Sequence, residues 1–139
     1  MTSNPFIGKW SYRSFYNIAD LNTDLNKLEL GNGTIDIREV TSTVLGGTIG
    51  GATWQLNLHG SFGYGSPMQV AFQGEGVVNG EKWIYGYIGW LVPAWPNSNS
   101  SLQVNAIVGS VTRVIAHSSS GGGVSPAGVV GSFFAVQVS

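Results

Sequence analysis

Side chains capable of acid–base or metal chemistry are few and scattered in this sequence. There are two histidines, His59 and His117, and no cysteine. Their spacing fits no metal-binding motif, and a single axial histidine for a haem is the one metal chemistry left open. Glu75 stands in an uncharged stretch, where an inward carboxylate could act as acid or base, but we expect it to face outward. We therefore expect no metal, no cofactor and no catalytic residue.

A serine- and glycine-rich run follows His117, from Ser118 to Gly123. A nucleophilic serine with His117 as its base needs a fixed geometry, which adjacent residues in a loop rarely hold, and no nucleophile elbow is present. The glycines lack the lysine and the following helix of a phosphate-binding loop. We expect His117 to end a strand with its ring held by backbone groups, and His59 to lie on a solvated strand face.

Aromatic side chains carry more information, because many of them recur at every second residue. Trp10, Tyr12 and Tyr16 alternate with other residues, and a period of two is a strand signal, since successive strand side chains point to opposite faces. If the alternation holds, one set of rings faces a shared interior. The side chains expected to line a ligand cavity are Tyr12, Tyr16, Trp54, Phe72, Trp83, Tyr85, Tyr87 and Arg113. Such a lining suits a flat apolar molecule with a polar end.

Strands joined by short turns must position these rings. Runs with a period of two, or apolar on both faces, succeed one another along the whole chain, and Asn79-Gly80 is a strong hairpin signal. Between the first two runs, residues 17–27 favour turns and allow one helical turn. Charged residues make up only 9%, and 21 glycines are present, which is typical of all-β proteins. The sequence predicts one domain, residues 1–139, folded as an up-and-down antiparallel β-barrel of about eight strands.

The start of the first strand, Gly8-Lys9-Trp10, resembles the calycin superfamily, which comprises the lipocalins, fatty-acid-binding proteins and avidins. The resemblance implies a closed barrel in which Trp10 plugs one end. It also implies that an arginine from a late strand lies across that ring as a cation–π partner, and Arg113 is the late arginine of this chain. The resemblance supports the fold and names no ligand.

Three segments are apolar on both faces, namely 82–92, 102–117 and 129–138. A barrel in water does not leave such a surface uncovered, because large apolar patches mark interfaces. We expect an outer patch formed by Ile84, Ile88, Trp90, Ile107, Val111 and Ile115. A symmetric homodimer or higher homo-oligomer would cover this patch.

Charge and hydropathy exclude several partners. The net charge is −1 and the six basic residues are dispersed, so no stripe exists to bind phosphates of nucleic acid. The longest apolar stretch, 83–95, is shorter than the ~20 residues that cross a bilayer. The first residues, MTSNPFIGK, lack the apolar region of a signal peptide. We expect a cytoplasmic protein, with secretion after removal of a signal as the alternative.

These observations predict a non-catalytic protein that binds a small hydrophobic or aromatic molecule inside its barrel. One alternative is a cofactor-free enzyme that cyclises or isomerises a substrate by shape and a few polar groups, such as Tyr12, Tyr85, Arg113 or Glu75. A second alternative is an interaction domain with a filled barrel. A third is a sugar-binding rim in the sequence AWPNSNSS, where Trp95 would stack on a pyranose.

Overall fold

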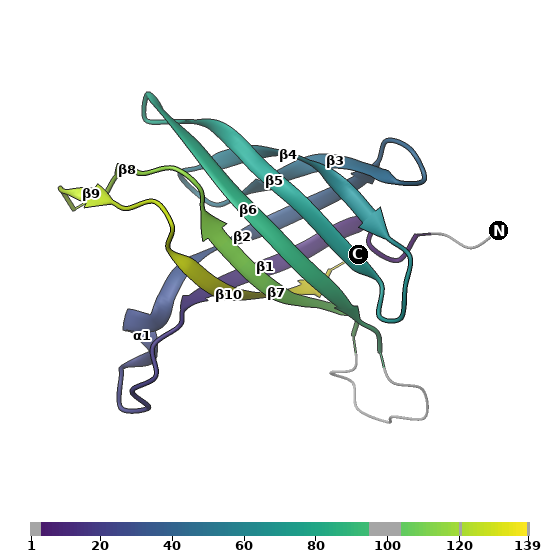
Figure 1. Ribbon diagram of the computed structural model, residues 1–139, viewed down its shortest axis with the longest axis horizontal. Helices are drawn as coiled ribbons and strands as arrows, with labels where there is room; N and C mark the ends of the chain where they lie inside the picture. Colours follow the sequence, from purple (N-terminus) through teal and green to yellow (C-terminus); the bar gives the residue numbers. More distant parts are fainter. Residues whose placement is uncertain (1–3, 95–103, 120, 139) are drawn as a thin grey trace.

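The computed structural model describes residues 4–94, 104–119 and 121–138, and it shows a closed antiparallel barrel (Figure 1). The barrel strands are β1 (Gly8–Tyr16), β2 (Glu29–Glu39), β3 (Val44–Gly50), β4 (Gln55–Gly63), β5 (Gln69–Val78), β6 (Glu81–Val92), β7 (Ala106–Arg113) and β10 (Val130–Gln137). Each pairs with the next along the chain, and β10 pairs with β1 to close the ring. The predicted up-and-down barrel of eight strands is confirmed.

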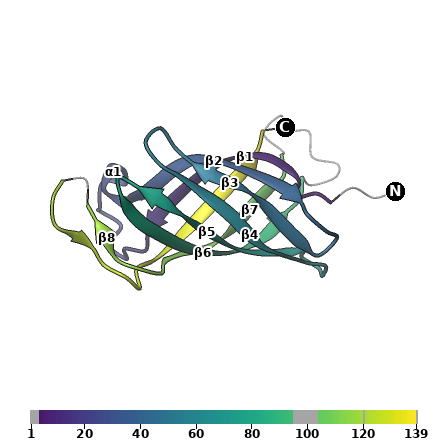
Figure 2. The same cartoon turned by 90° about the horizontal axis from the view of Figure 1, so that it is seen from above.

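Two small elements lie outside the barrel wall, at the same end in both views (Figure 2). The helical turn α1 (Leu25–Leu28) precedes β2, and the side chain of Asp24 caps it by accepting a hydrogen bond from the Asn26 amide at 3.1 Å. Strands β8 (His117–Ser118) and β9 (Val124–Ser125) form a hairpin between β7 and β10. Among the described residues, none of the helical segments has the length and hydropathy to cross a bilayer.

The hairpin corrects the predicted strand 102–117, because β7 already ends at Arg113. There the backbone of Arg113 bonds to Gly128 and Val129 at the start of the returning chain. The residues after Arg113 therefore leave the barrel wall, and His117 comes to lie beside the barrel end.

Trp10 closes one end of the barrel, as the calycin resemblance implies. Its ring is fully buried, and its Nε1 donates a hydrogen bond to the Phe6 carbonyl at 3.0 Å. Phe6 is also fully buried and stacks on Phe62, with ring centroids 6.0 Å apart. These three rings fill the end of the barrel.

The expected contact between Arg113 and Trp10 is wrong. Strands β1 and β7 both pair antiparallel with β10 and so run in the same direction. Trp10 lies near the start of β1, whereas Arg113 is the last residue of β7, at the opposite end of the barrel. The guanidinium instead lies 5.7 Å from the centre of the Tyr85 ring.

Ile107 and Val111 are also placed differently from expectation. They are 0% and 1% exposed and belong to the core, so they form no part of an outer patch. Because β7 is apolar on both faces, its alternation could not distinguish the inner from the outer set. Arg113 shares their face and turns inward toward Tyr85. Of the other expected patch residues, Ile84, Ile88 and Trp90 lie on the opposite face of β6 from the inward Tyr85 and Tyr87, and Ile115 lies in the bend after β7.

We predict that Gly47→Ala destabilises the barrel, because Gly47 has a φ of 138° and an added Cβ would lie 1.8 Å from the Asp36 carbonyl oxygen. The expected loss is about 2 kcal/mol or more in the free energy of unfolding, measured by urea denaturation. The matched variant Gly121→Ala, where a Cβ meets nothing within 4 Å, should change it by less than about 0.5 kcal/mol. Equal effects of the two substitutions would contradict this account.

Candidate ligand-binding site

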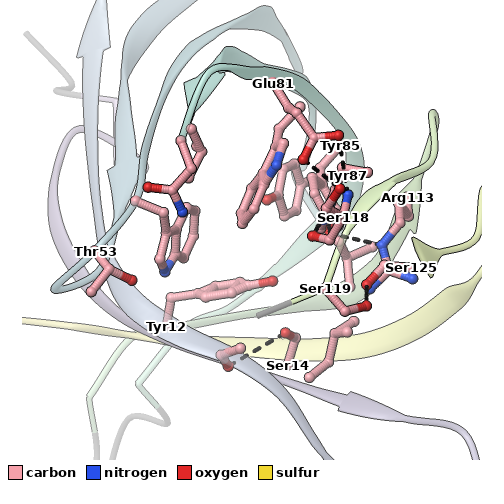
Figure 3. A pocket seen from close by; sticks show the side chains of 18 of the residues that line it. Tyr12, Ser14, Thr53, Glu81, Tyr85, Tyr87, Arg113, Ser118, Ser119 and Ser125 are labelled. Atoms are coloured by element: carbon pink, nitrogen blue, oxygen red, sulfur yellow. Dashed lines mark hydrogen bonds between the residues drawn. The ribbon is translucent and has the colours of Figure 1, made fainter. Parts of the chain in front are cut away.

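A cavity of about 730 Å³ occupies the end of the barrel opposite Trp10 (Figure 3). A layer of packed rings forms its floor, in which Phe72 stacks on Tyr87 at 4.8 Å and Tyr12 lies tilted against Phe133 at 5.7 Å, centroid to centroid. Its lining includes exposed residues such as Asn79 and Ser118, so the cavity reaches the surface at this end.

Most of the side chains predicted to line a cavity do so. Those that line it are Tyr12, Tyr16, Trp54, Trp83, Tyr85, Tyr87 and Arg113. Phe72 lies below them in the floor and is not part of the lining. Val111, expected on the outside, lines the cavity instead.

Several lining residues were missed by sequence reasoning. Ser14 continues the two-residue period of Trp10 and Tyr12, so that alternation could have identified it. Glu81 and His117 come from separate segments, and no sequence signal joins them to the cavity. Pairing of the strands and docking of the β8–β9 hairpin bring them there.

A chain of hydrogen bonds runs along one wall of the cavity. Arg113 Nε donates to the Tyr85 hydroxyl oxygen at 2.8 Å, and this hydroxyl lies 2.7 Å from His117 Nε2. His117 Nδ1 lies 3.0 Å from the Ser118 carbonyl oxygen. Because a carbonyl only accepts, Nδ1 carries the proton of the neutral ring, and Nε2 accepts from Tyr85. The Tyr85 hydroxyl is thus held between a cationic donor and an imidazole acceptor.

Arg113 places a buried positive charge beside the cavity. It is 5% exposed, and its Nη1 donates to the Pro126 carbonyl oxygen at 3.2 Å. Burial lowers its pKa, but the hydrogen bonds and charge interactions with Tyr85 and Tyr16 together raise the pKa by more, so the guanidinium stays charged. Within the described segments the only ion pair joins Lys82 to Glu75, at 3.0 Å. Hydroxyl and carbonyl oxygens, without a carboxylate, therefore surround this cation.

The hydroxyls of Tyr12, Tyr85 and Tyr87 remain protonated at neutral pH. Burial raises the pKa of Tyr12 to about 12, against small opposing effects of Ser14 and Tyr87. Burial also raises the pKa of Tyr87 well above its ordinary value. For Tyr85 burial again raises the pKa, although the hydrogen bond and charge of Arg113 oppose it. The cavity therefore offers neutral hydroxyls that can donate hydrogen bonds.

Flat rings form the wall beside this hydrogen-bonded chain. The His117 ring stacks on Trp83, with centroids 4.0 Å apart and an interplanar angle of 14°, and Trp54 follows at 6.4 Å from Trp83. The Glu81 carboxylate accepts a hydrogen bond from the Ser118 amide at 3.2 Å. These contacts attach the β8–β9 hairpin to β6 and hold the wall in place.

Other candidates from the sequence lie away from the cavity. Glu75 is on the outer side of β5 in its ion pair with Lys82, and His59 is exposed on the outer side of β4, as expected for both. In the part of the chain that the structure describes, no group of three metal-ligating side chains comes together. Trp95, at the centre of the suggested sugar-binding rim, lies outside the described residues.

Comparison of the chain with protein-family models, with curated proteins and with solved structures finds no match. What the chain shares with the calycin superfamily is thus the closed antiparallel barrel of eight strands and the buried Trp10 at one end. The chemistry of the cavity must be read from its own residues.

We predict that alkaline pH destabilises the protein through its buried tyrosines. Between pH 10 and 12 the unfolded chain releases the Tyr12 proton while the folded protein retains it, so the free energy of unfolding falls as pH rises. The slope is at most about 1.4 kcal/mol per pH unit for each such group. In urea titrations, Tyr12→Phe should reduce this slope. An unaltered slope in Tyr12→Phe would refute the assignment.

Proposed function

We propose that this calycin-like barrel binds a small, flat, apolar molecule that carries an anionic end. The observation behind the proposal is a cavity of about 730 Å³ whose walls combine stacked rings with a buried arginine. Pockets for small molecules typically measure about 300–1,000 Å³ and are mostly apolar, with a few polar groups that orient the ligand. A hollow barrel end also speaks against the alternative of an interaction domain with a filled barrel.

The rings favour a flat ligand. Trp83 and His117 stack almost parallel, and Tyr12 lies across the cavity with its hydroxyl toward the side of Tyr85 and Arg113 (Figure 3). Aromatic faces bind flat apolar molecules through large contact areas and offset stacking. The apolar frame of the ligand would therefore lie against Trp83, with its end toward Arg113.

The buried charge of Arg113 favours an anionic end. A buried cation is costly unless it is paired, and here hydroxyl and carbonyl oxygens are its partners in the described structure. A carboxylate or sulfonate on the ligand would supply the missing countercharge through a charge-assisted hydrogen bond. The protonated hydroxyls of Tyr12 and Tyr87 can donate to the same group.

Two dyes that share an apolar frame test this proposal. Anilinonaphthalene sulfonate and phenylnaphthylamine have the same ring system, and only the first carries an anionic group. Fluorescence titration should show tighter binding of the sulfonate to the wild-type protein. Arg113→Met should weaken sulfonate binding by about tenfold or more, the effect of one charge-assisted hydrogen bond, and should leave phenylnaphthylamine binding nearly unchanged.

Two further variants complete that experiment. Arg38→Met removes an exposed arginine on β2 and should change the affinity for neither dye. Trp83→Ala should weaken the binding of both dyes. If neither dye binds the folded wild-type protein, the barrel is no ligand carrier. If Arg113→Met weakens both dyes equally, the anionic end is wrong while the apolar site stands.

A second candidate function is catalysis without a cofactor, and one specific observation favours it. The Tyr85 hydroxyl lies between Arg113 Nε and His117 Nε2, a position in which it can release a proton to the imidazole and regain it. Such a group can assist isomerisation or cyclisation of a substrate that the rings hold in a reactive shape. Of the polar groups suggested from the sequence, Tyr12, Tyr85 and Arg113 line the cavity and Glu75 does not.

Tyr85→Phe separates the carrier from the enzyme. A small molecule that copurifies with the protein would be identified by native mass spectrometry, and its conversion followed by NMR. An enzyme should lose conversion by at least about a hundredfold in Tyr85→Phe, the usual contribution of a proton-transfer group, while keeping the bound molecule. A carrier should convert nothing in either form, and equal conversion rates in the two proteins would exclude Tyr85 from the chemistry.

A further inference from the structure

The outer face of β6, β7 and β10 is uncharged over most of its length. Outward positions on β6 between Ile84 and Val92, and all outward positions on β7 and β10, carry apolar, small or hydroxyl side chains. Trp90 and Phe134 are 40% and 39% exposed on this face, which is a large exposure for such rings. The three strands are neighbours in the sheet, and β6 and β7 lie side by side on the near side of the barrel in Figure 1.

A ridge and a groove lie next to each other on this face. The ridge is a row of side chains opposite one another in the strand register, Trp90 with Val108 and Val108 with Phe134. The groove has a volume of about 410 Å³ and extends from β7 across β6 to β5 and β4, where Gln73 and His59 line it. On β6 and β7 its lining includes Gly86, Ser110 and Thr112, and at Gly86 no side chain fills it.

Ile88 lines the edge of the groove on β6 and lies between Trp90 and Gly86, each two residues away from it. Each is therefore about 7 Å from Ile88 along the strand, on opposite sides. Ile88 is paired with Ser110 in the register, so these two residues mark one level across the sheet. Consider a two-fold axis that lies in the plane of the interface at the level of Ile88 and Ser110 and runs perpendicular to the strands. Rotation about this axis places the ridge of one copy over the groove of the other.

We propose that two copies of the chain form a symmetric dimer through this face, with Trp90 of each protomer seated in the groove above Gly86 of the other. A two-fold interface requires a surface that is complementary to itself. A ridge and a groove at equal distances from the axis meet that requirement. The same operation brings the Ile88 side chains together at the centre of the interface.

Charge and size both favour a second copy as the partner. Like charges face each other near a two-fold axis, and this face has none there to repel its own copy. Strands about 4.8 Å apart that rise about 3.3 Å per residue give the four neighbouring strands β5, β6, β7 and β10 a face of roughly 20 Å by 25 Å. That is the scale of the ~800 Å² of accessible surface that each partner buries in a stable dimer.

The test makes the large side chain small and the small one large. Trp90→Ala removes the tryptophan of the ridge, and Gly86→Leu fills the groove. An added Cβ at Gly86 has Val114 Cγ2 as its nearest neighbour at 3.7 Å, and the backbone there has no positive φ, so a single chain accommodates the change. Each variant alone should dimerise at least about tenfold more weakly than the wild type, which should have twice the 14.7 kDa chain mass in native mass spectrometry.

A mixture of the two variants gives the decisive measurement. In a mixed pair, Trp90 of the Gly86→Leu chain faces an open Gly86, and the new leucine faces the truncated residue 90. The mixture should therefore form a heterodimer that neither variant forms with itself. Gly121→Leu, at a loop position with nothing within 4 Å of a Cβ, is the control and should dimerise like the wild type.

Other results would overturn the proposal. A wild-type protein that stays monomeric up to high micromolar concentration has no such interface. Folded variants that dimerise as well as the wild type, or a mixture without heterodimers, would place the contact elsewhere. If Gly86→Leu does not fold, as judged by circular dichroism, Ser110→Arg replaces it, because it sets two like charges at the axis and should yield monomers.

Discussion

Closure of the sheet between β1 and β10 is the constraint on which the rest of this structure depends. A closed barrel assigns every strand residue to one of two environments, an interior of limited volume or an outer surface, and the pleat makes the assignment alternate. The cavity and the outer ridge and groove both follow from it. The interior set of β6 supplies the rings of the cavity, and the exterior set of the same strand supplies the ridge and the groove.

The two ends of the interior differ in what fills them. At one end, Phe6, Trp10 and Phe62 pack together, and the one polar atom of the tryptophan ring bonds to a backbone carbonyl. At the other end, the inward side chains include tyrosines and an arginine. Their polar atoms need hydrogen-bond partners, so these side chains do not pack into an apolar core. The hydrogen-bonded chain from Arg113 through Tyr85 to His117 meets that need along one wall. The remainder of the end stays hollow.

The β8–β9 hairpin, which lies between β7 and β10 in the chain, forms part of the cavity wall. Stacking of His117 on Trp83 and the bond from the Ser118 amide to Glu81 attach it to β6, and the Pro126 carbonyl accepts from Arg113. A buried arginine without a carboxylate partner in the described chain is thus stabilised in part by a segment outside the barrel. The shape of the cavity wall and the hydrogen bonds of Arg113 both depend on this docking.

The sequence by itself determined the fold class, the strand order and the tyrosines and tryptophans of the cavity lining, because a period of two is a local property of the chain. Trp10 and Tyr12 could be placed inside because they alternate with Lys9, Ser11 and Arg13. On β6, alternation showed that Tyr85 and Tyr87 share a face, and their aromatic character favoured that face as the inner one. Only the tertiary structure decided which face of β7 is inner, because Ile107, Val108 and Val111 are equally apolar. The inner face is the one from which Arg113 donates its hydrogen bond to Tyr85. It also decided that Arg113 and Trp10 lie at opposite ends and that His117 reaches the cavity. These facts depend on strand direction and on contacts between residues far apart in the chain, which local periodicity does not encode.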